Sequence, residues 1–355
     1  MYLSEMQILT AYNDIDRRQW QRLTDESPVA TWFQSPEAYD FFASLPALMT
    51  PFVFAVGRKG SGGGDEGGVD RLTGVVAGYV TRENNYVKQY FTRRAIIYGG
   101  PLIAEDISDE ELHELLSAVV RYLSSRTIYI EARNFNDYSR WRPVFERCGF
   151  RYQPHLNFHV DTSSVETVSQ NLGKNRKRDI RVSLRDGARI VDSPTIEQVR
   201  AYYDILSKLY ATKVRTPLFA WDFFAKLYEQ PSSCFLLVEY EGRIVGGTVC
   251  VMLSSKVVYE WFVCGEDGRY KNVFPSELAT YAGLQFAADH SCVRFDMMGA
   301  GTPEEHYGVR DFKARFGGQQ VEHGRFLCIC APLLYKIGQC GVSVIRQRGG
   351  ASSCK

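Results

Sequence analysis

The chain repeats one pattern of residues, and this internal repeat constrains its fold more than any other feature. A pair of strand-like runs at residues 52–58 and 72–80 is echoed at residues 235–243 and 244–253. Later in each copy, Arg-Cys-Gly-Phe at residues 147–150 is echoed by Arg-Phe-Gly-Gly at residues 315–318. The copies drift mainly where a glycine-rich stretch, residues 57–68, is inserted in the first hairpin. A repeat of this length predicts two copies of one domain.

Length and composition agree with two globular domains. The chain has 355 residues, of which 45% are apolar and 23% charged, with a net charge of +1. This balance does not favour a general polyanion-binding protein. The amino terminus lacks a secretion signal and the apolar runs are too short to span a bilayer, so we expect a cytoplasmic protein. Nine cysteines without metal-ligand spacing indicate buried free thiols and no metal site.

The expected elements alternate in an α/β order. Residues 6–24 have helical spacing, residues 52–100 form a strand meander, and Gly99 with Gly100 indicates a bulge. In the first copy we expect helices at 108–125 and 136–147 around a strand at 127–132. In the second we expect helices at 165–185, 195–213, 218–229 and 275–289, and strands at 234–253, 257–264 and 293–298. The pattern predicts mixed α+β sheets in two domains, 1–158 and 159–355.

Several motifs add a family resemblance to this order. They lie at residues 33–36 (Phe-Gln-Ser-Pro), 98–101 (Tyr-Gly-Gly-Pro), 175–181, 295–299 and 307–318. The element order resembles the GNAT acyltransferase fold, and two tandem copies resemble the Fem (FemABX) family of aminoacyl transferases that build peptidoglycan cross-bridges. The chain lacks the long helical arm of members that use charged tRNA. It therefore looks like an armless relative. It also has Asp40 and its neighbours where several members have a lysine, which weakens a direct transfer of the muropeptide substrate.

The resemblance implies an N-acyl or aminoacyl transferase that acts on an amine of a cell-envelope precursor. It places Lys313 opposite the reacting carbonyl, where an ammonium can stabilise an oxyanion; the other interpretation is an exposed helix lysine. Asp296, at the end of the central strand, is a candidate to orient an amine or accept a proton. Its alternative is a cap or an arginine partner. Tyr98 and Phe312 are expected to contact substrate through their motifs.

Two further groups of residues are candidates for binding substrate. The basic run at residues 174–185 presents Arg176, Arg178 and Arg181 on a helix, which suits the phosphates of a nucleotide-linked substrate or of tRNA, or is a solvated basic face. Glu305, His306 and Tyr307 lie in a loop expected over the carboxyl end of the sheet, where ligands bind. The alternative for this loop is ordinary surface chemistry.

The donor is the least constrained part of the prediction. Acyl-CoA enzymes of the GNAT fold hold the cofactor pyrophosphate at a glycine-rich turn before a helix. The equivalent turn, residues 268–277, has Arg269 and Lys271 but no Gly-x-Gly. Aminoacyl-tRNA or acyl-CoA therefore remain candidate donors. The alternative functions are an acyl-CoA-dependent N-acetyltransferase for an amino sugar or small metabolite, and a non-catalytic GNAT-fold binding protein.

The carboxyl-terminal tail is the last segment with a recognisable pattern. Residues 332–348 are amphipathic and end in basic residues. A weak contact with a membrane surface would suit a lipid-linked precursor, whereas packing as a terminal helix is the simpler expectation.

Overall fold

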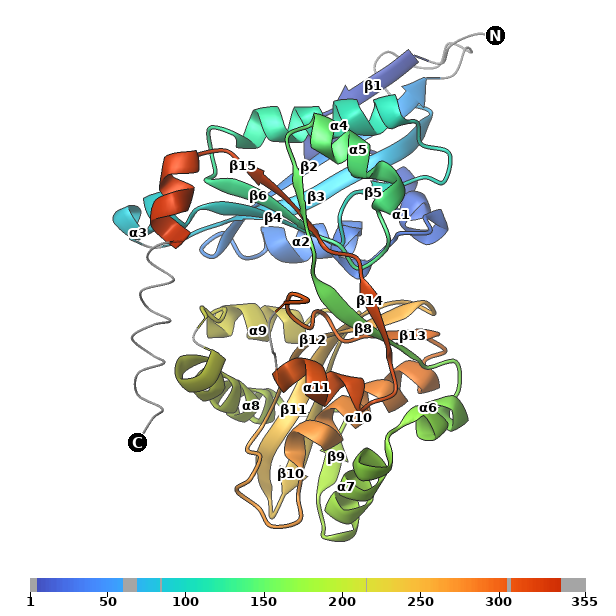
Figure 1. The fold of residues 1–355 in the computed structure, drawn as a ribbon, viewed down its shortest axis with the longest axis vertical. Coiled ribbons are helices and arrows are strands. Elements are labelled where there is room, and N and C mark those ends of the chain that lie inside the picture. The colour runs from blue at the N-terminus through green and yellow to red at the C-terminus, as the bar shows by residue number, and fades with distance from the viewer. Residues whose placement is uncertain (1–4, 60–68, 84, 215, 305–307, 340–355) are drawn as a thin grey trace. The chain divides into compact units, whose positions relative to one another are not determined.

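The computed structural model describes residues 5–59, 69–83, 85–214, 216–304 and 308–339. The chain divides into two compact units, each considered by itself. Unit 1 contains Met1–Gln153 together with His323–Lys355, and unit 2 contains Pro154–Glu322. Each unit holds one mixed sheet, so the expected α/β class with two sheets is confirmed (Figure 1).

Unit 1 is built on the sheet order β1-β2-β3-β4-β6-β15-β7, with β5 paired to β3. Only the β4–β6 pair is parallel among the described pairs of this sheet. The strands are β1 (Glu5–Leu9), β2 (Met49–Lys59), β3 (Arg71–Thr81), β4 (Arg94–Tyr98), β5 (Leu102–Ile103), β6 (Tyr129–Arg133), β7 (Arg151–Gln153) and β15 (Arg325–Ile329). The helices are α1 (Arg17–Glu26), α2 (Pro36–Ala43), α3 (Tyr86–Thr92), α4 (Asp109–Leu123), α5 (Arg142–Arg147) and residues 332–339.

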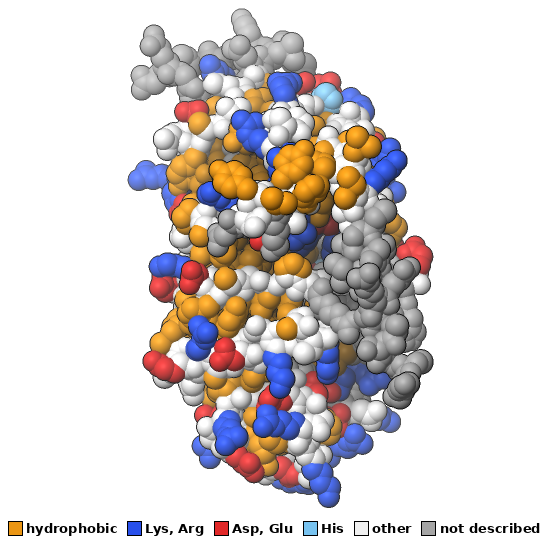
Figure 2. Space-filling model, turned by 90° about the vertical axis from the view of Figure 1, so that its left-hand side faces the viewer, with side chains coloured by type: hydrophobic (Ala, Val, Ile, Leu, Met, Phe, Trp, Pro, Cys, Tyr) orange, Lys and Arg blue, Asp and Glu red, His pale blue; other side chains and the backbone are white. Residues whose placement is uncertain are grey.

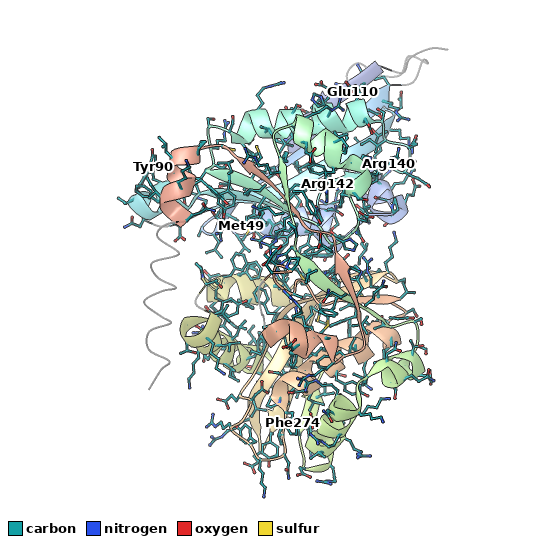
Figure 3. The ribbon with its side chains drawn as sticks, in the orientation of Figure 1. Met49, Tyr90, Glu110, Arg140, Arg142 and Phe274 are labelled. Carbon is teal, nitrogen blue, oxygen red and sulfur yellow. The ribbon has the colours of Figure 1, made fainter. Side chains whose placement is uncertain are left out.

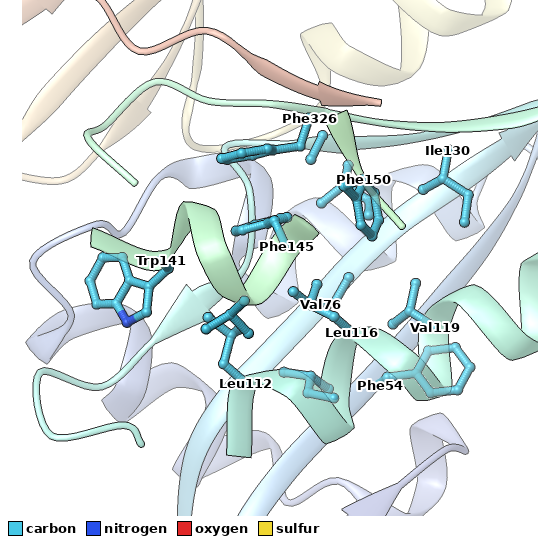
Figure 4. Close-up of a cluster of buried hydrophobic side chains, with 14 of the residues drawn as sticks. Phe54, Val76, Leu112, Leu116, Val119, Ile130, Trp141, Phe145, Phe150 and Phe326 are labelled. Atoms are coloured by element: carbon cyan, nitrogen blue, oxygen red, sulfur yellow. The ribbon is translucent and has the colours of Figure 1, made fainter. Parts of the chain in front are cut away.

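The core of unit 1 lies between its sheet and the helices α4 and α5 (Figure 4). Helix α4 begins at a capping box, in which Ser108 and Glu111 satisfy each other's backbone N–H groups. Its leucines then face Phe54 and Val76 of the sheet. The Phe145 ring of α5 stacks on Phe326 of β15, with 3.8 Å between centroids. Helices α1 and α2 pack against β2 and β3.

Unit 2 is built on the sheet order β14-β8-β13-β12-β11-β10-β9, in which β12 and β13 are parallel. The strands are β8 (Leu156–Asp161), β9 (Arg189–Val191), β10 (Ser233–Tyr240), β11 (Arg243–Leu253), β12 (Val257–Gly265), β13 (Arg294–Asp296) and β14 (Gln319–Glu322). The helices are α6 (Val165–Asn171), α7 (Lys174–Arg185), α8 (Ile196–Leu209), α9 (Trp221–Tyr228), α10 (Pro275–Asp289) and α11 (Gly308–Ala314). Side chains of α6, α7, α10 and α11 share one core with the sheet.

The two sheets share one chain order. Each has an antiparallel hairpin (β2–β3 or β10–β11), a long helix (α4 or α10), a parallel central strand (β6 or β13) and a shorter helix (α5 or α11). Each shorter helix is followed by a glycine with a left-handed backbone, φ +85° at Gly149 and +80° at Gly317. A glycine is required at the second position because a Cβ there would lie 2.0 Å from the Asn171 oxygen.

The division into units differs from the expected boundaries, 1–158 and 159–355, at both limits. Strand β8 crosses residue 158 and pairs with β13 and β14, in the sheet of unit 2. Strand β15 pairs with β6 and β7, in the sheet of unit 1. An apolar run predicts a buried strand, but its partner is set by contacts far away in the sequence, which periodicity does not encode.

Two local expectations are also corrected. Residues 5–9 form β1 rather than the start of a helix, and α1 begins only at Arg17, behind the cap residue Asp16. Gly99 and Gly100 do not bulge a ladder; they end β4 in a turn with φ +82° and +77°. The cysteines described by the structure are free thiols, as expected. Among the described residues, no helix is long and apolar enough to cross a bilayer.

Candidate active site

A tight turn follows the central strand β13 in unit 2. The Asp296 carboxylate accepts hydrogen bonds from Asn157 Nδ2 at 2.7 Å and from the Met298 backbone N–H at 2.8 Å. The Gly299 N–H donates to Asn157 Oδ1 at 2.9 Å. Both Met298 and Gly299 have left-handed backbones, φ +51° and +95°. The buried carboxylate and amide therefore fix the turn and the direction of its carbonyl groups.

The ammonium of Lys313 binds these carbonyl groups from α11. Lys313 Nζ donates to Met297 O and, at 2.7 Å, to Gly299 O. The side chain is buried, with 6% of its surface exposed, so it is not the exposed helix lysine of the alternative interpretation. Burial lowers the pKa of Lys313, although Glu260 and Asp296 oppose this shift. Two of the three ammonium protons bind the turn, and no hydrogen bond to a described residue uses the third.

Asp296 is buried and contacts a histidine as well as the turn. His159 Nε2 lies 3.1 Å from Asp296 Oδ2. Burial alone would raise the pKa of Asp296, but the His159 contact and the Asn157 hydrogen bond outweigh it and lower the pKa below its usual value. A carboxylate held ionised in this way is a poor proton acceptor. Its observed contacts are those of a residue that positions the turn beneath Lys313.

Glu260 is a buried acid of β12 that the sequence analysis did not weigh. Its Oε1 accepts from Thr280 Oγ1 at 2.8 Å, while Oε2 has no hydrogen-bond partner among the described residues. Burial raises the pKa of Glu260, and the nearby Lys313 charge moderates this shift. A raised pKa and an unused oxygen suit an acid or base. The available signal was one glutamate within an apolar strand, Val-Val-Tyr-Glu-Trp-Phe-Val.

Glu260 and the turn lie where two parallel strands separate. β12 pairs with β13 only over Val257–Tyr259 and Arg294–Asp296, although β12 continues to Gly265. Glu260 and Met297 are thus the first residues beyond the paired stretch. A register shift opposite Val249 and Cys250 leaves Trp261 as an extra residue in β12. Ligands of α/β sheets bind at such carboxyl ends, where neighbouring strands diverge.

The basic helix α7 contributes packing at Arg176. Arg176 is buried, and its Nη1 lies 2.5 Å from Glu277 Oε1 and 3.8 Å from Asp179 Oδ2. Its guanidinium also lies over the rings of Phe312 and Phe316 of α11, at 4.8 and 5.2 Å from their centroids. The structure therefore brings Arg176 and Phe312 together, and their contact fixes α7 against the helix that carries Lys313.

The other two candidate arginines of α7, Arg178 and Arg181, are exposed. Arg178 Nε and Nη2 donate to Asp179 Oδ1 at 3.0 and 2.8 Å. Arg181 is exposed to solvent. Both guanidiniums are accessible to an anionic ligand, whereas Arg176 is committed to the interior.

The turn before α10 places Arg269 and Lys271 at the surface. Arg269 Nη1 binds both carboxylate oxygens of Glu266, at 2.5 and 2.6 Å, and Lys271 is exposed. The first turn of α10 already holds an acid, because the Asp267 carboxylate accepts from the N–H and hydroxyl groups of Ser276 at 3.0 and 2.5 Å. An acid at a helix N-terminus occupies the place where a pyrophosphate would bind. Helix α4 likewise has three acids in its first turn, and Figure 3 labels one of them, Glu110.

In unit 1, two of the sequence motifs meet around Tyr98. Gln34 Nε2 donates to Gly99 O at 3.0 Å and to Gly100 O at 2.8 Å. The Phe33 ring packs on Tyr98 with 5.0 Å between centroids. The Gln34 amide therefore fixes the turn that follows Tyr98, and the two motifs form one local structure.

The Tyr98 hydroxyl belongs to a buried network of charges. It accepts from Arg133 Nη1 at 2.9 Å. Glu131 accepts from Arg133 Nε and Arg325 Nη1, at 2.9 and 2.8 Å. Burial opposes ionisation of Glu131, but the two arginines lower its pKa to about 2. Two guanidiniums thus share one carboxylate beside Tyr98, which leaves this end of β6 positive.

The loop between β13 and α11 is described only in part. Glu305, His306 and Tyr307 lie outside the described residues. From α11, after these residues, Arg310 Nε donates to Ala300 O at 3.0 Å, and its guanidinium also binds Thr302 O. Arg310 therefore ties the start of the loop to α11, close to the Lys313 turn.

Comparison with known proteins supports this architecture. Residues 237–341 match the model of the FemAB family. The structure described as FemX shares 12% identity and a TM-score of 0.68, over 93% of this chain and 99% of that one. A tandem GNAT protein from the clavulanic acid biosynthesis pathway shares 12% identity and a TM-score of 0.53, over 92% and 99% of the two chains.

A third similar structure is the C-terminal domain of a putative lysylphosphatidylglycerol synthetase from Agrobacterium fabrum. It shares 12% identity and a TM-score of 0.54, over 92% of this chain and 95% of that one. No curated protein sequence matches the chain. The chain has a Fem-like tandem GNAT fold, as the sequence analysis expected. Together, the FemAB-family match and this fold support transferase activity.

Proposed function

We propose that the protein is an acyltransferase of the Fem type that transfers an activated acyl or aminoacyl group to an amine of a cell-envelope precursor. The observation that carries the proposal is the pair of buried groups, Lys313 and Glu260, where β12 and β13 separate. A buried cation and a buried acid beside the place where these strands separate match the two needs of acyl transfer to an amine, which are an oxyanion partner and a proton acceptor.

The proposed reaction is a nucleophilic substitution at a carbonyl carbon. The amine nitrogen bonds to the carbon of an ester or thioester, and the carbonyl oxygen becomes an oxyanion that accepts the third N–H of Lys313. Glu260 takes the proton that the nitrogen loses. The bond to the leaving oxygen or sulfur then breaks, and that atom receives the proton from Glu260. Asp296 acts only through the turn, by holding the carbonyl groups of Met297 and Gly299 toward Lys313.

Anionic parts of the substrates need separate partners. We propose that Arg178 and Arg181 of α7 meet phosphates of a nucleotide- or lipid-linked precursor or of an aminoacyl-tRNA, and that Arg176 serves packing only. The exposure of the first two and the burial of the third support this assignment. The acceptor precursor and charged tRNA are cytoplasmic or face the cytoplasm, so we propose that the protein acts there.

The test uses purified full-length protein and a transfer assay. Lys313→Met should lower turnover by about a hundredfold to a thousandfold, the range for loss of one oxyanion partner. The matched control is Lys208→Met, which removes an exposed lysine of the same unit and should leave turnover unchanged. Thermal unfolding of both variants checks that the fold persists. Undiminished turnover by a folded Lys313→Met protein would remove Lys313 from the reaction.

The donor is tested separately, by ligand-dependent thermal stabilisation. We expect charged tRNA or a nucleotide-linked muropeptide to raise the melting temperature. Acetyl-CoA should have little effect, because acids occupy the first turns of α10 and α4. Stabilisation by acetyl-CoA alone would instead favour the acyl-CoA-dependent N-acetyltransferase, with Arg269 and Lys271 as candidate pyrophosphate partners. No stabilisation and no turnover with any ligand would favour a non-catalytic binding protein.

A further inference from the structure

Helix α3 of unit 1 exposes an unusual share of large apolar side chains. Tyr86 is 93% exposed and Val87 68%, and Tyr90 and Phe91 are also exposed. The helix sequence, Tyr-Val-Lys-Gln-Tyr-Phe-Thr, contains no acidic residue. Figure 3 labels Tyr90 on this helix. Single exposed apolar residues are ordinary, whereas a contiguous set on one short helix marks a contact surface.

The apolar surface continues onto the helix at residues 332–339, in the same unit. Its Tyr335 ring packs on Tyr129, with 5.4 Å between centroids, and the Tyr129 hydroxyl accepts from Arg94, two residues beyond α3. This helix exposes Leu333 at 79% and Ile337 at 56%. The two helices lie side by side in Figure 1, and Figure 2 shows hydrophobic side chains gathered over the same part of the molecule.

Cations stand among these aromatic rings. The Arg93 guanidinium lies over the Tyr90 ring at 4.8 Å, and Arg126 lies over Tyr122 at 4.0 Å. A hollow of about 670 Å³ lies beside them, and its lining includes Pro51 and other apolar residues. Among its described lining residues, Arg82 and Arg126 are cationic and Glu83 is acidic. The surface therefore combines tyrosines, aliphatic side chains and an excess of positive charge.

We propose that this face, α3 with residues 332–339 and the adjoining arginines, docks on the surface of an anionic lipid bilayer. Tyrosine rings prefer the boundary between headgroups and acyl chains, and aliphatic side chains such as Val87, Leu333 and Ile337 enter just below it. Guanidiniums stacked on such rings lie at the depth of the lipid phosphates. Lys and Arg side chains near an anionic surface are attracted to it.

A second copy of the chain fits the same face less well. A two-fold interface would bring the face against itself, and its arginines would meet arginines. Nucleic acid would stack on the tyrosines but would leave the exposed aliphatic side chains without a partner. Lipid is the occupant that satisfies both the apolar and the cationic parts. This proposal does not rest on the proposed acyl transfer.

The test is co-sedimentation of the full chain with vesicles. We expect binding to vesicles of phosphatidylcholine with phosphatidylglycerol, and weaker binding to phosphatidylcholine alone or at high salt. The variant Tyr86→Ser/Tyr90→Ser/Phe91→Ser should lose at least about tenfold in partition coefficient. The matched control is Val293→Ser, which changes an apolar residue of unit 2 that is also exposed. It should bind as the original chain does.

A second pair of measurements keeps the outcome unambiguous. Arg82→Gln/Arg126→Gln should weaken binding to anionic vesicles but not to neutral ones, since it removes two positive charges and keeps the exposed apolar side chains. Thermal unfolding should be unchanged in both multiple variants, because the altered side chains are at the surface. Equal sedimentation of the triple variant and the original chain would overturn the proposal. So would a dimer in sedimentation velocity that the triple variant abolishes, which would identify a second copy as the occupant.

Discussion

At the scale of single residues, Glu260 makes the sharpest prediction that does not need a substrate. Burial raises its pKa above the ordinary 4.5, so folding favours the protonated form. The stability that this protonation provides is complete below pH 4.5 and is lost as pH rises through the raised pKa. Glu260→Gln keeps the Thr280 contact but does not titrate. Its free energy of unfolding, relative to the original chain, should therefore increase with rising pH in urea titrations.

A second acid, Glu197, should show the opposite dependence of stability on pH. The hydrogen bond with Thr195 lowers the pKa of Glu197, so its contribution is present above pH 4.5 and is lost as pH falls. Glu197→Gln should consequently gain relative stability toward low pH, by a small amount because the side chain is exposed. If Glu260→Gln and Glu197→Gln followed the same pH dependence, the assignment of a raised pKa to Glu260 would be wrong.

Residue-scale roles were predicted from the sequence only where a motif carried them. Lys313 was singled out because it lies in the motif at residues 307–318. Its burial and its two carbonyl partners depend on a turn formed by Asp296 and Asn157, which are distant in sequence. Glu260 has no motif, and its importance arises from the separation of β12 and β13 around it. Such a site is assembled by tertiary structure and is not encoded in local spacing.

At the scale of elements, α7 separates packing from binding. Arg176→Met should destabilise the protein by about 3–5 kcal/mol, because it leaves the partly buried Glu277 and the buried Asp179 without this partner. Arg181→Met, on the exposed face of the same helix, should change the free energy of unfolding by less than about 0.5 kcal/mol. If α7 binds an anionic substrate, Arg181→Met should raise the KM for that substrate, although it leaves the free energy of unfolding nearly unchanged. Urea unfolding and transfer kinetics on both variants measure the two effects.

The outcome that contradicts this division is equally clear. A stable Arg176→Met protein with a raised KM would place Arg176 in the substrate site and its ion pairs in a secondary role. The sequence predicted a helix that presents Arg176, Arg178 and Arg181, but the acids that hold Arg176 come from α7 itself and from α10. Periodicity predicts a basic helix. Whether each guanidinium is buried or exposed depends on which elements pack against it.

At the scale of the whole molecule, the repeat predicted two sheets but did not predict how the chain passes from one sheet to the other. Each repeat ends in a helix, a left-handed glycine and two short strands, and the second of these strands lies in the sheet of the other unit. Residues 1–158 therefore lack β15, one strand of the unit 1 sheet. Residues 154–322, in contrast, contain every strand of the unit 2 sheet. The two units should depend differently on the carboxyl-terminal segment.

A chain that ends at Glu322 should keep unit 2 folded and lose unit 1. Strand β15 lies between β6 and β7, and its Phe326 is buried against Phe145. Its removal therefore leaves β6 paired only with β4, leaves β7 without its partner strand, and opens the core. Amide hydrogen exchange should then show protection in β10–β13 and little in β4 and β6. A chain that ends at Gln339, which retains β15, should protect both sheets, and a peptide of residues 323–339 added to the shorter chain should restore β6. Full protection of β6 in the shorter chain would mean that unit 1 folds without its inserted strand.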